Sequence, residues 1–195
     1  MYKQLKSLIF LLIPILSLTA QSKVTEYLNI PGPITIDSKT YYLAWSSHPN
    51  DSYYKQEYLA SNDNIEKYKT LIMIDFVKGD FKVEDAINQK IHELEKMKQS
   101  NPVIKYTKYE NNGEYILDFL ISKNSDDGKE ILIAERNVYR YKLISDKNHS
   151  GILLFGVSER GYQENIDAFF KNLKKDSIKM VESVGNYQLP DVKLK

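Results

Sequence analysis

The segment at residues 45–54 carries the densest group of side chains that could bind a ligand or do chemistry. Its sequence, WSSHPNDSYY, holds the only Trp of the chain, a His, hydroxyl groups, an Asp and two Tyr. Trp and Tyr are the residues most often found as binding hot spots, and loops carry binding residues disproportionately. We therefore predict a recognition loop with the binding residues Trp45, Ser47, His48, Asn50, Tyr53 and Tyr54.

Hydrolysis by a Ser–His–Asp triad is the competing interpretation of this segment. In a triad the base must face the nucleophile and must itself be oriented by an acid. Ser47 and His48 are neighbours in sequence, so an extended backbone would point them to opposite sides. Residues 46–52 are rich in turn formers, which favours a polar turn of a hairpin. We therefore predict no catalytic residue here.

Motifs of phosphate, metal and thiol chemistry are absent from the sequence. The Gly residues form neither GxGxxG nor GxxxxGK[ST], and no GxSxG, HExxH or calcium-loop pattern occurs. The chain has no Cys, and His48, His92 and His149 are far apart in sequence, whereas a zinc site needs ligands at defined spacing. We predict that the chain has no metal and no cofactor and is not an enzyme.

Charged side chains also occur inside apolar segments, where a carboxylate must be paired or neutralised. The turn at Asp127-Gly128 leaves two registers open. A two-residue loop places Asp118 opposite Asn137, and a three-residue loop with a bulge places Asp118 opposite Arg136. The second register pairs opposite charges. The residues predicted to form structural ion pairs are Asp118, Arg136, Glu135 and Arg140.

The elements that must position these side chains begin with a hairpin of residues 34–36 and 41–45. Strands follow at residues 53–59 and 70–77. The segment 70–77, TLIMIDFV, is apolar on both faces, which is typical of a central strand covered on both sides.

Residues 102–157 are predicted to form a meander of four strands. Asn112-Gly113 and Asp127-Gly128 separate its first three strands, and these dipeptides are the strongest short-range hairpin signals. Residues 83–99 repeat apolar side chains at helical spacing. A second helix starts near Tyr162 and runs to Gly185, with a break at Ser177.

The resulting order is four strands, a helix, four strands and a helix (ββββ-α-ββββ-α), which predicts an α+β sandwich with an antiparallel sheet. In its element order, with a helix at residues 83–99, the meander at 102–157 and a closing helix from Tyr162, the chain resembles exported bacterial proteins with the PsbP-like fold. That resemblance implies a binding or assembly factor rather than an enzyme.

The first 20 residues are predicted to be a signal peptide. Lys3 and Lys6 precede an apolar run at residues 8–18, and cleavage is expected after Ala20. The apolar run is short for a bilayer span, so no stable membrane insertion is expected after cleavage. Residues 21–195 then form one domain. A net charge of +1 gives no reason to expect nucleic-acid binding, and the expected location is periplasmic or secreted.

The functional hypothesis is a non-catalytic binding or accessory protein with a protein partner in the cell envelope. One specific version is an immunity-type inhibitor that neutralises a toxin. A second hypothesis is a protein that binds a small ligand or a glycan through the Tyr and Trp side chains, since the chain has 15 Tyr. A hydrolase is the third.

Overall fold

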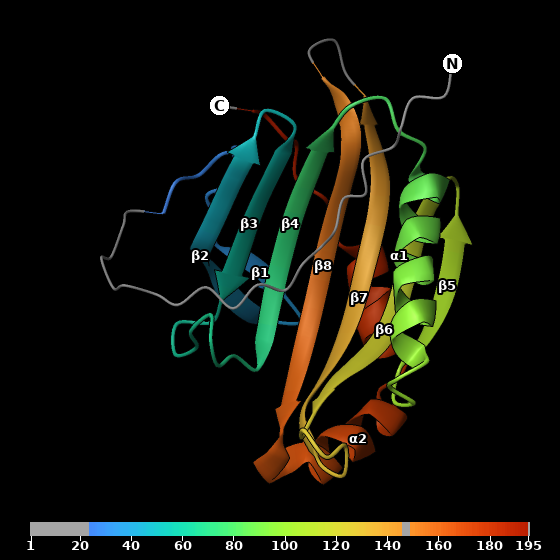
Figure 1. Ribbon diagram of the computed structural model, residues 1–195. Coiled ribbons are helices and arrows are strands. Elements are labelled where there is room, and N and C mark those ends of the chain that lie inside the picture. The colour runs from blue at the N-terminus through green and yellow to red at the C-terminus, as the bar shows by residue number, and fades with distance from the viewer. Residues whose placement is uncertain (1–23, 146–148, 195) are drawn as a thin grey trace.

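An antiparallel sheet of eight strands organises the part of the chain described by the computed structural model, residues 24–145 and 149–194. The order of the strands is β1-β2-β3-β4-β8-β7-β6-β5, so β4 and β8 lie at the centre (Figure 1). The predicted signal peptide, residues 1–20, lies outside the described residues. None of the helices formed by the described residues is long and apolar enough to cross a lipid bilayer.

The elements follow one another in two strand-rich halves separated by α1. The first strands are β1 (Ile34–Ile36), β2 (Lys39–Asn50), β3 (Tyr53–Leu59) and β4 (Thr70–Lys78). After α1 (Val83–Lys98) come β5 (Lys105–Asn111), β6 (Glu114–Asn124), β7 (Ile131–Ser145) and β8 (Ser150–Tyr162). The closing segments are a 3₁₀ turn (Gln163–Asn165), α2 (Ile166–Lys175) and α3 (Lys179–Asn186).

The predicted fold class, an α+β sandwich of the PsbP type with alternating groups of strands and helices, is wrong. The described residues form a single antiparallel sheet, and their three α-helices are short, with 16, 10 and 8 residues. The reason is the pairing of β4 with β8 along their length, from Thr70–Glu159 to Lys78–Gly151. Both strands are buried almost throughout, so each needs a neighbour on both sides, and together they join the two halves.

The predicted turn at residues 46–52 is also wrong, because β2 continues to Asn50. Trp45, Ser46 and Ser47 pair with β3, and only two residues remain for the turn. The Asn50 side chain accepts hydrogen bonds from the backbone N–H (3.1 Å) and the hydroxyl (2.9 Å) of Ser52. Side-chain bonding of this kind is a common way for Asn to stabilise a turn, and here it tightens the hairpin.

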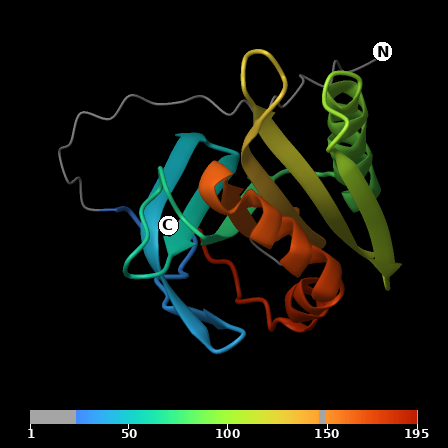
Figure 2. The same ribbon diagram turned by 90° about the horizontal axis from the view of Figure 1, so that it is seen from below.

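Each face of the sheet carries a core cluster, and the alternating side chains of β4 contribute to both. Ile72, Ile74 and Phe76 belong to a core cluster that includes buried residues of α3 and of the C-terminal segment, residues 187–194. Leu71 and Met73 belong to a second cluster with buried residues of α1. Figure 2 shows α1 on one side of the sheet and the C-terminal helices on the other. We call these sides the α1 face and the tail face.

Candidate functional site

The strands divide the predicted recognition loop between the two faces of the sheet. Trp45 lies opposite Glu57, and Ser47 lies opposite Lys55. Lys55 in turn lies opposite Asp75 of β4. Because directly paired residues share a face, this set lies on the α1 face, where Asp75 neighbours Leu71 and Met73 in the alternation of β4. Tyr53 joins it, since its hydroxyl donates to the Asp75 carboxylate at 2.9 Å.

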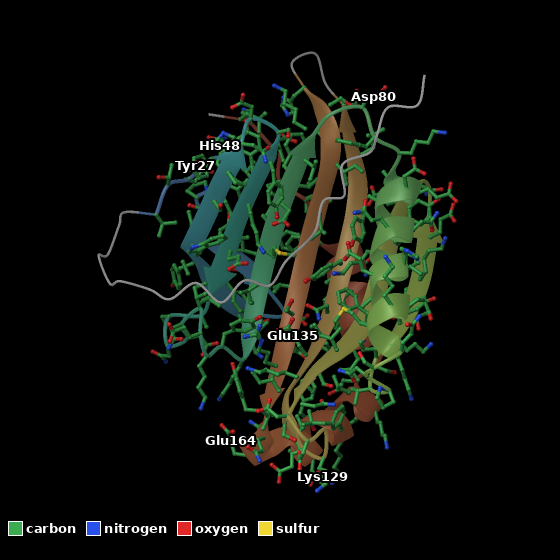
Figure 3. The ribbon with its side chains drawn as sticks, viewed as in Figure 1. Tyr27, His48, Asp80, Lys129, Glu135 and Glu164 are labelled. Carbon is green, nitrogen blue, oxygen red and sulfur yellow. The ribbon has the colours of Figure 1, made fainter. Side chains whose placement is uncertain are left out.

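His48 and Tyr54 lie on the tail face, away from Trp45. Their rings stack with centroids 4.1 Å apart and an interplanar angle of 13°, and Tyr54 is buried in the tail-face core. Tyr27 packs beside His48 with ring centroids 5.3 Å apart (Figure 3). His48 Nδ1 also donates to the carbonyl oxygen of Tyr53 at 3.0 Å. His48 and Tyr54 therefore pack against Tyr27, near the start of the described chain. The Asn50 side chain bonds to Ser52 within the turn.

The residues on the α1 face form a second group, which we call the β2–β4 surface: Trp45, Ser47, Tyr53, Lys55, Glu57 and Asp75. Lys55 Nζ lies 2.8 Å from Glu57 Oε1, and 6.0 Å from the centroid of the Trp45 ring. Trp45 and Tyr53 are half-buried, so each presents an aromatic edge beside a charged pair. Aromatic side chains such as Trp and Tyr are enriched at recognition surfaces.

Asp75 lies beneath this surface and is only 1 % exposed. Burial raises the pKa of its carboxyl to about 6, although Lys55 and the hydrogen bond from Tyr53 act to lower it. Its second oxygen, Oδ1, has no hydrogen-bond partner among the described residues. Burial lowers the pKa of Lys55, but the carboxylates of Asp75 and Glu57 outweigh this and raise it, so Lys55 remains a cation.

Coverage of the α1 face is uneven. The helix α1 contacts β5, β6 and β7. Figure 1 shows it on that side of the sheet, with β8 between β7 and the strands β2, β3 and β4. The β2–β4 surface is thus outside the area that α1 covers. A half-covered sheet face that carries large side chains is a place where a partner can dock.

The predicted structural ion pairs form in a register that neither sequence alternative contained. Asp118 lies opposite Val138, and the loop between β6 and β7 is longer than two or three residues. Arg136 is two residues from Val138 on the same face, and its Nε and Nη2 reach the two Asp118 oxygens at 3.0 and 2.8 Å. The guanidinium also donates to the carbonyl oxygen of Ser177, which holds the start of α3.

The other two predicted charges bond to residues that the sequence did not single out. Arg140 Nε lies 2.6 Å from Glu114 Oε2, and its Nη1 donates to the carbonyl oxygen of Tyr187 at 2.9 Å. Glu135 accepts hydrogen bonds from Arg160 and, at 2.8 Å, from the Tyr68 hydroxyl. Glu135 lies lower on the sheet than His48 in Figure 3.

Gln56 is a structural residue that the sequence reading missed. It is fully buried on the tail face, where Oε1 accepts from the backbone N–H groups of Tyr27 and Leu28 at 2.7 and 3.0 Å. Its Nε2 donates to the carbonyl oxygen of Ile30 at 3.1 Å. The sequence contained a signal for it: Gln56 alternates with Tyr54 and Tyr58 along the predicted strand and therefore lies on the same face as these rings. A buried amide needs hydrogen-bond partners.

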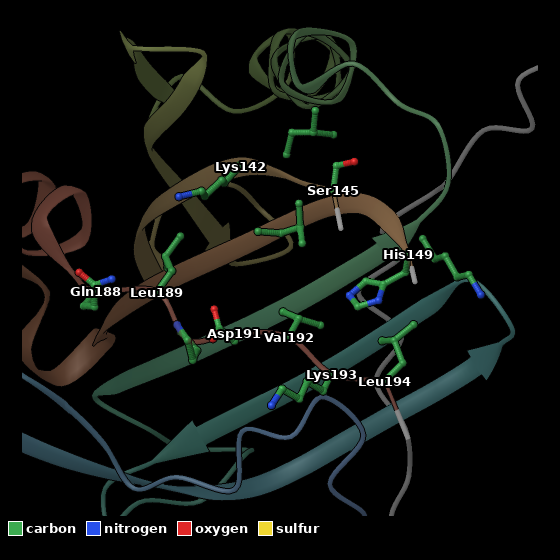
Figure 4. A pocket seen from close by; sticks show the side chains of 13 residues that line it. Lys142, Ser145, His149, Gln188, Leu189, Asp191, Val192, Lys193 and Leu194 are labelled. Carbon is green, nitrogen blue, oxygen red and sulfur yellow. The ribbon is translucent and has the colours of Figure 1, made fainter. Parts of the chain in front are cut away.

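A groove of about 980 Å³ lies on the tail face between the C-terminal segment and the end of β7 (Figure 4). Lys142 comes from β7 and Lys193 from the C-terminal segment, on opposite sides of the groove. We call it the tail groove. As for metals, no three His, Asp or Glu side chains gather in a way that could hold an ion within residues 24–145 and 149–194.

Comparisons with known proteins identify one relationship. No curated protein and no solved structure matches the chain. A protein-family model matches residues 28–189. This match runs from Leu28, which the Gln56 side chain holds against the sheet, through all eight strands and into the C-terminal segment. The chain therefore belongs to the family that this model defines.

Proposed function

We propose that the chain is an exported, non-catalytic binding protein of the periplasm or the extracellular space that recognises a protein partner through the β2–β4 surface. Export rests on the N-terminal sequence, with Lys3 and Lys6 before the apolar run. The observation that carries the binding role is the placement of the sole Trp beside the Lys55–Glu57 pair on the half of the α1 face that α1 does not cover.

The polar groups of this surface support recognition better than a role in holding the fold. Lys55 bonds to Glu57, and Tyr53 bonds to Asp75, so these side chains of β3 and β4 pair with one another. Two charged side chains that already form an ion pair can keep it when a partner protein docks, and this lowers the free-energy cost of removing them from water. Trp45 then supplies apolar contact area.

The breadth of the surface favours a protein over a small molecule. Its side chains come from three neighbouring strands, which lie about 5 Å apart in a sheet. Small ligands bind mainly in concave sites that enclose most of their surface. Side chains spread over a sheet face instead fit a broad partner surface with an aromatic residue near its centre.

The test is capture of the partner from an envelope extract by the purified protein. Trp45→Ala should keep a near-native melting temperature and lose capture, because truncation of an aromatic hot spot costs about 2 kcal/mol or more of binding energy. Tyr109→Ala is the matched control, since Tyr109 is an exposed aromatic residue (37 %) at the opposite edge of the sheet.

Three results contradict this proposal. The wild-type protein captures nothing, Trp45→Ala captures the partner as well as the wild type does, or Trp45→Ala unfolds. Unfolding would mark Trp45 as a core residue, because loss of a core Trp costs about 3–5 kcal/mol of folding stability.

A further inference from the structure

The outer edge of β5 is a strand edge that no other described segment occupies. β5 is the last strand in the order of the sheet and pairs only with β6 (Figure 1). Its seven residues pair with β6 without a register shift, and all of them except Tyr106 are exposed. A regular, exposed strand edge presents a row of backbone N–H and C=O groups with which another strand can pair.

The opposite edge of the sheet is built differently. β1 pairs with the first residues of β2, register shifts interrupt the pairing of β2 with β3 at two places, and Pro49 has no backbone N–H. Bulges and Pro are devices that prevent an edge from pairing with another chain, and β5 has neither. Its Lys105 and Lys108 discourage pairing with a strand that offers no acidic residue, but β5 itself contains Glu110.

The hairpin of β5 and β6 determines which backbone groups of β5 are available. Asn111 and Glu114 flank its two-residue turn, and in such a hairpin the flanking residues form a hydrogen-bonded pair. Successive residues of a strand direct their backbone groups to alternate sides. Tyr106, Lys108 and Glu110 therefore direct their N–H and C=O groups away from β6, toward the open edge.

We propose that β5 pairs with β5 of a second copy of this chain, antiparallel and about a two-fold axis through Lys108. In this register Tyr106 lies opposite Glu110 of the second copy, and the two Lys108 residues lie opposite each other. All seven residues of β5 overlap, and each opposed pair of outward-directed residues exchanges two backbone hydrogen bonds. The axis makes the interface self-complementary and joins the two sheets edge to edge, with both α1 faces on the same side.

The charges beside β5 are complementary in this register. Lys98 of α1 has its Nζ 6.0 Å from the centroid of the Tyr106 ring. Because Tyr106 lies opposite Glu110 of the second copy, Lys98 comes close to that carboxylate, and the axis repeats the pair. Glu110 forms no ion pair with another described residue. Lys98 contacts Glu95 at 3.6 Å, an exposed pair that holds it only weakly.

A register centred on Thr107 is the alternative, since it also opposes outward-directed residues. It would place Tyr106 opposite Lys108 of the second copy and bring Lys98 toward that lysine, so cations would meet. In the proposed register the two Lys108 ammonium groups lean away from the axis. Each lies 5.3 Å from the centroid of the Tyr115 ring, on β6 of its own chain. The charges therefore favour the axis at Lys108.

Disulfide trapping tests the pairing and its register, because the chain has no Cys. Lys108→Cys should form a covalent dimer on mild oxidation, since hydrogen-bonded residues opposite each other have Cα atoms about 5.5 Å apart, within reach of a disulfide. Thr107→Cys and Lys105→Cys are matched controls on the same exposed strand. Their Cα atoms lie about 8 and 20 Å from those of the second copy, too far for a disulfide.

Sedimentation velocity over a concentration series measures the dimer without an added Cys. The wild-type protein should pass from monomer to dimer as its concentration rises. Glu110→Lys should weaken the dimer about tenfold, because the axis repeats each lost attraction, and Lys98→Glu in the same chain should restore most of it. Glu66→Lys makes the same charge change at an exposed position between β3 and β4 and should leave the dimer unchanged.

The inference is overturned if the wild-type protein stays monomeric throughout the series, if Lys108→Cys forms no covalent dimer, or if either control Cys forms one as readily. It is also overturned if Glu110→Lys weakens the dimer no more than Glu66→Lys does. The strands β8, β7 and β6 separate β5 from the β2–β4 surface. Partner capture with Trp45→Ala therefore tests a separate claim.

Discussion

On the tail face, polar side chains of the sheet bond to backbone groups of the segments that cover it, whereas on the α1 face they bond mainly to one another. Gln56 holds the backbone near Leu28, and Arg136 and Arg140 hold carbonyl oxygens around α3. On the α1 face, Tyr53 bonds to Asp75. On the same face, Lys55 bonds to Glu57. The hydroxyls of Tyr139 and Ser158 both donate to the side-chain oxygen of Asn137.

This difference indicates that the tail face stabilises the fold, whereas the uncovered part of the α1 face is available to a partner. A side chain that satisfies buried backbone groups cannot be removed without leaving those groups unpaired, which is costly in a buried position. Side-chain pairs on a half-covered surface contribute less to stability. The tail face should therefore be sensitive to substitution, and the β2–β4 surface should tolerate it while losing function.

The largest effect on stability is expected for Gln56→Leu. The change leaves the Tyr27 N–H without its acceptor and removes one of two partners of the Leu28 N–H and of the Ile30 carbonyl oxygen, which keep Glu26 and the Tyr58 hydroxyl. An unpaired buried group costs about 1–3 kcal/mol, and each lost hydrogen bond adds about 1 kcal/mol. We expect the free energy of unfolding to fall by about 3 kcal/mol or more, measured by urea denaturation. Gln163→Leu removes an exposed amide that bonds only to Glu130 among the described residues and should change stability by less than about 0.5 kcal/mol.

A fall of similar size in both variants would show that Gln56 has no special role in attaching the start of the described chain. Crystallography or hydrogen exchange of Gln56→Leu then adds a local readout. Protection should be lost first at Tyr27, whose N–H donates to the Gln56 amide oxygen, and less at Leu28, whose N–H also donates to Glu26.

A smaller effect, of opposite sign, is expected for Asp75→Asn on the α1 face. Burial raises the pKa of Asp75 from 3.8 to about 6, so the folded protein holds its proton at pH values where the unfolded chain has lost it. The stabilising contribution is complete below about pH 4, falls as the pH rises to about 6, and is absent above. Asn cannot ionise and should raise stability at pH 7 by about 2 kcal/mol.

Urea denaturation at pH 4, 5, 6 and 7 checks this prediction. The difference between wild type and Asp75→Asn should grow from pH 4 to pH 6 and then stay constant. Asp80→Asn, at an exposed Asp, serves as the control and should show no such trend. A variant that is less stable than the wild type at pH 7 would contradict the prediction, because the interactions of the carboxylate with Lys55 and Tyr53 would then outweigh the cost of its burial.

Local structure was predictable from the sequence where backbone chemistry dictates it. Asn112 and Gly113 both have positive φ, 52° and 77°, as a type I′ turn requires, and the hairpin of β5 and β6 forms around them. The strand at residues 53–59 and the helix at residues 83–98 also have their predicted positions within a residue. In each case a turn signal or a repeat of apolar residues lies within the segment itself.

Long-range pairing and register were not predictable in the same way. Nothing in the sequence of β4 or β8 names the other as its neighbour, so their union into one sheet was missed. The loop at Ser125–Glu130, closed by the bond of Ser125 N–H to the Glu130 carbonyl oxygen (2.9 Å), shifted the register of Asp118. A one-residue shift moves side chains to the other face.

The candidate site was predictable only in part for the same reason. A register shift between Leu43 and Trp45 in β2 decides which face Trp45 occupies, and a bulge of this kind has no clear sequence signal. The residues that complete the β2–β4 surface, Lys55, Glu57 and Asp75, come from β3 and β4. Their contribution depends on cross-strand pairing, so a reading confined to residues 45–54 does not find them.

The most direct test of the contrast between the two faces is oxidative footprinting of the protein, free and in complex with the partner captured from an envelope extract. Mass spectrometry reports the oxidation of each aromatic side chain. The account predicts that oxidation of Trp45 and Tyr53 falls several-fold in the complex, while oxidation of the exposed Tyr109 at the far edge stays the same. Equal oxidation of Trp45 in the free and bound protein, or protection confined to the tail face, would contradict it.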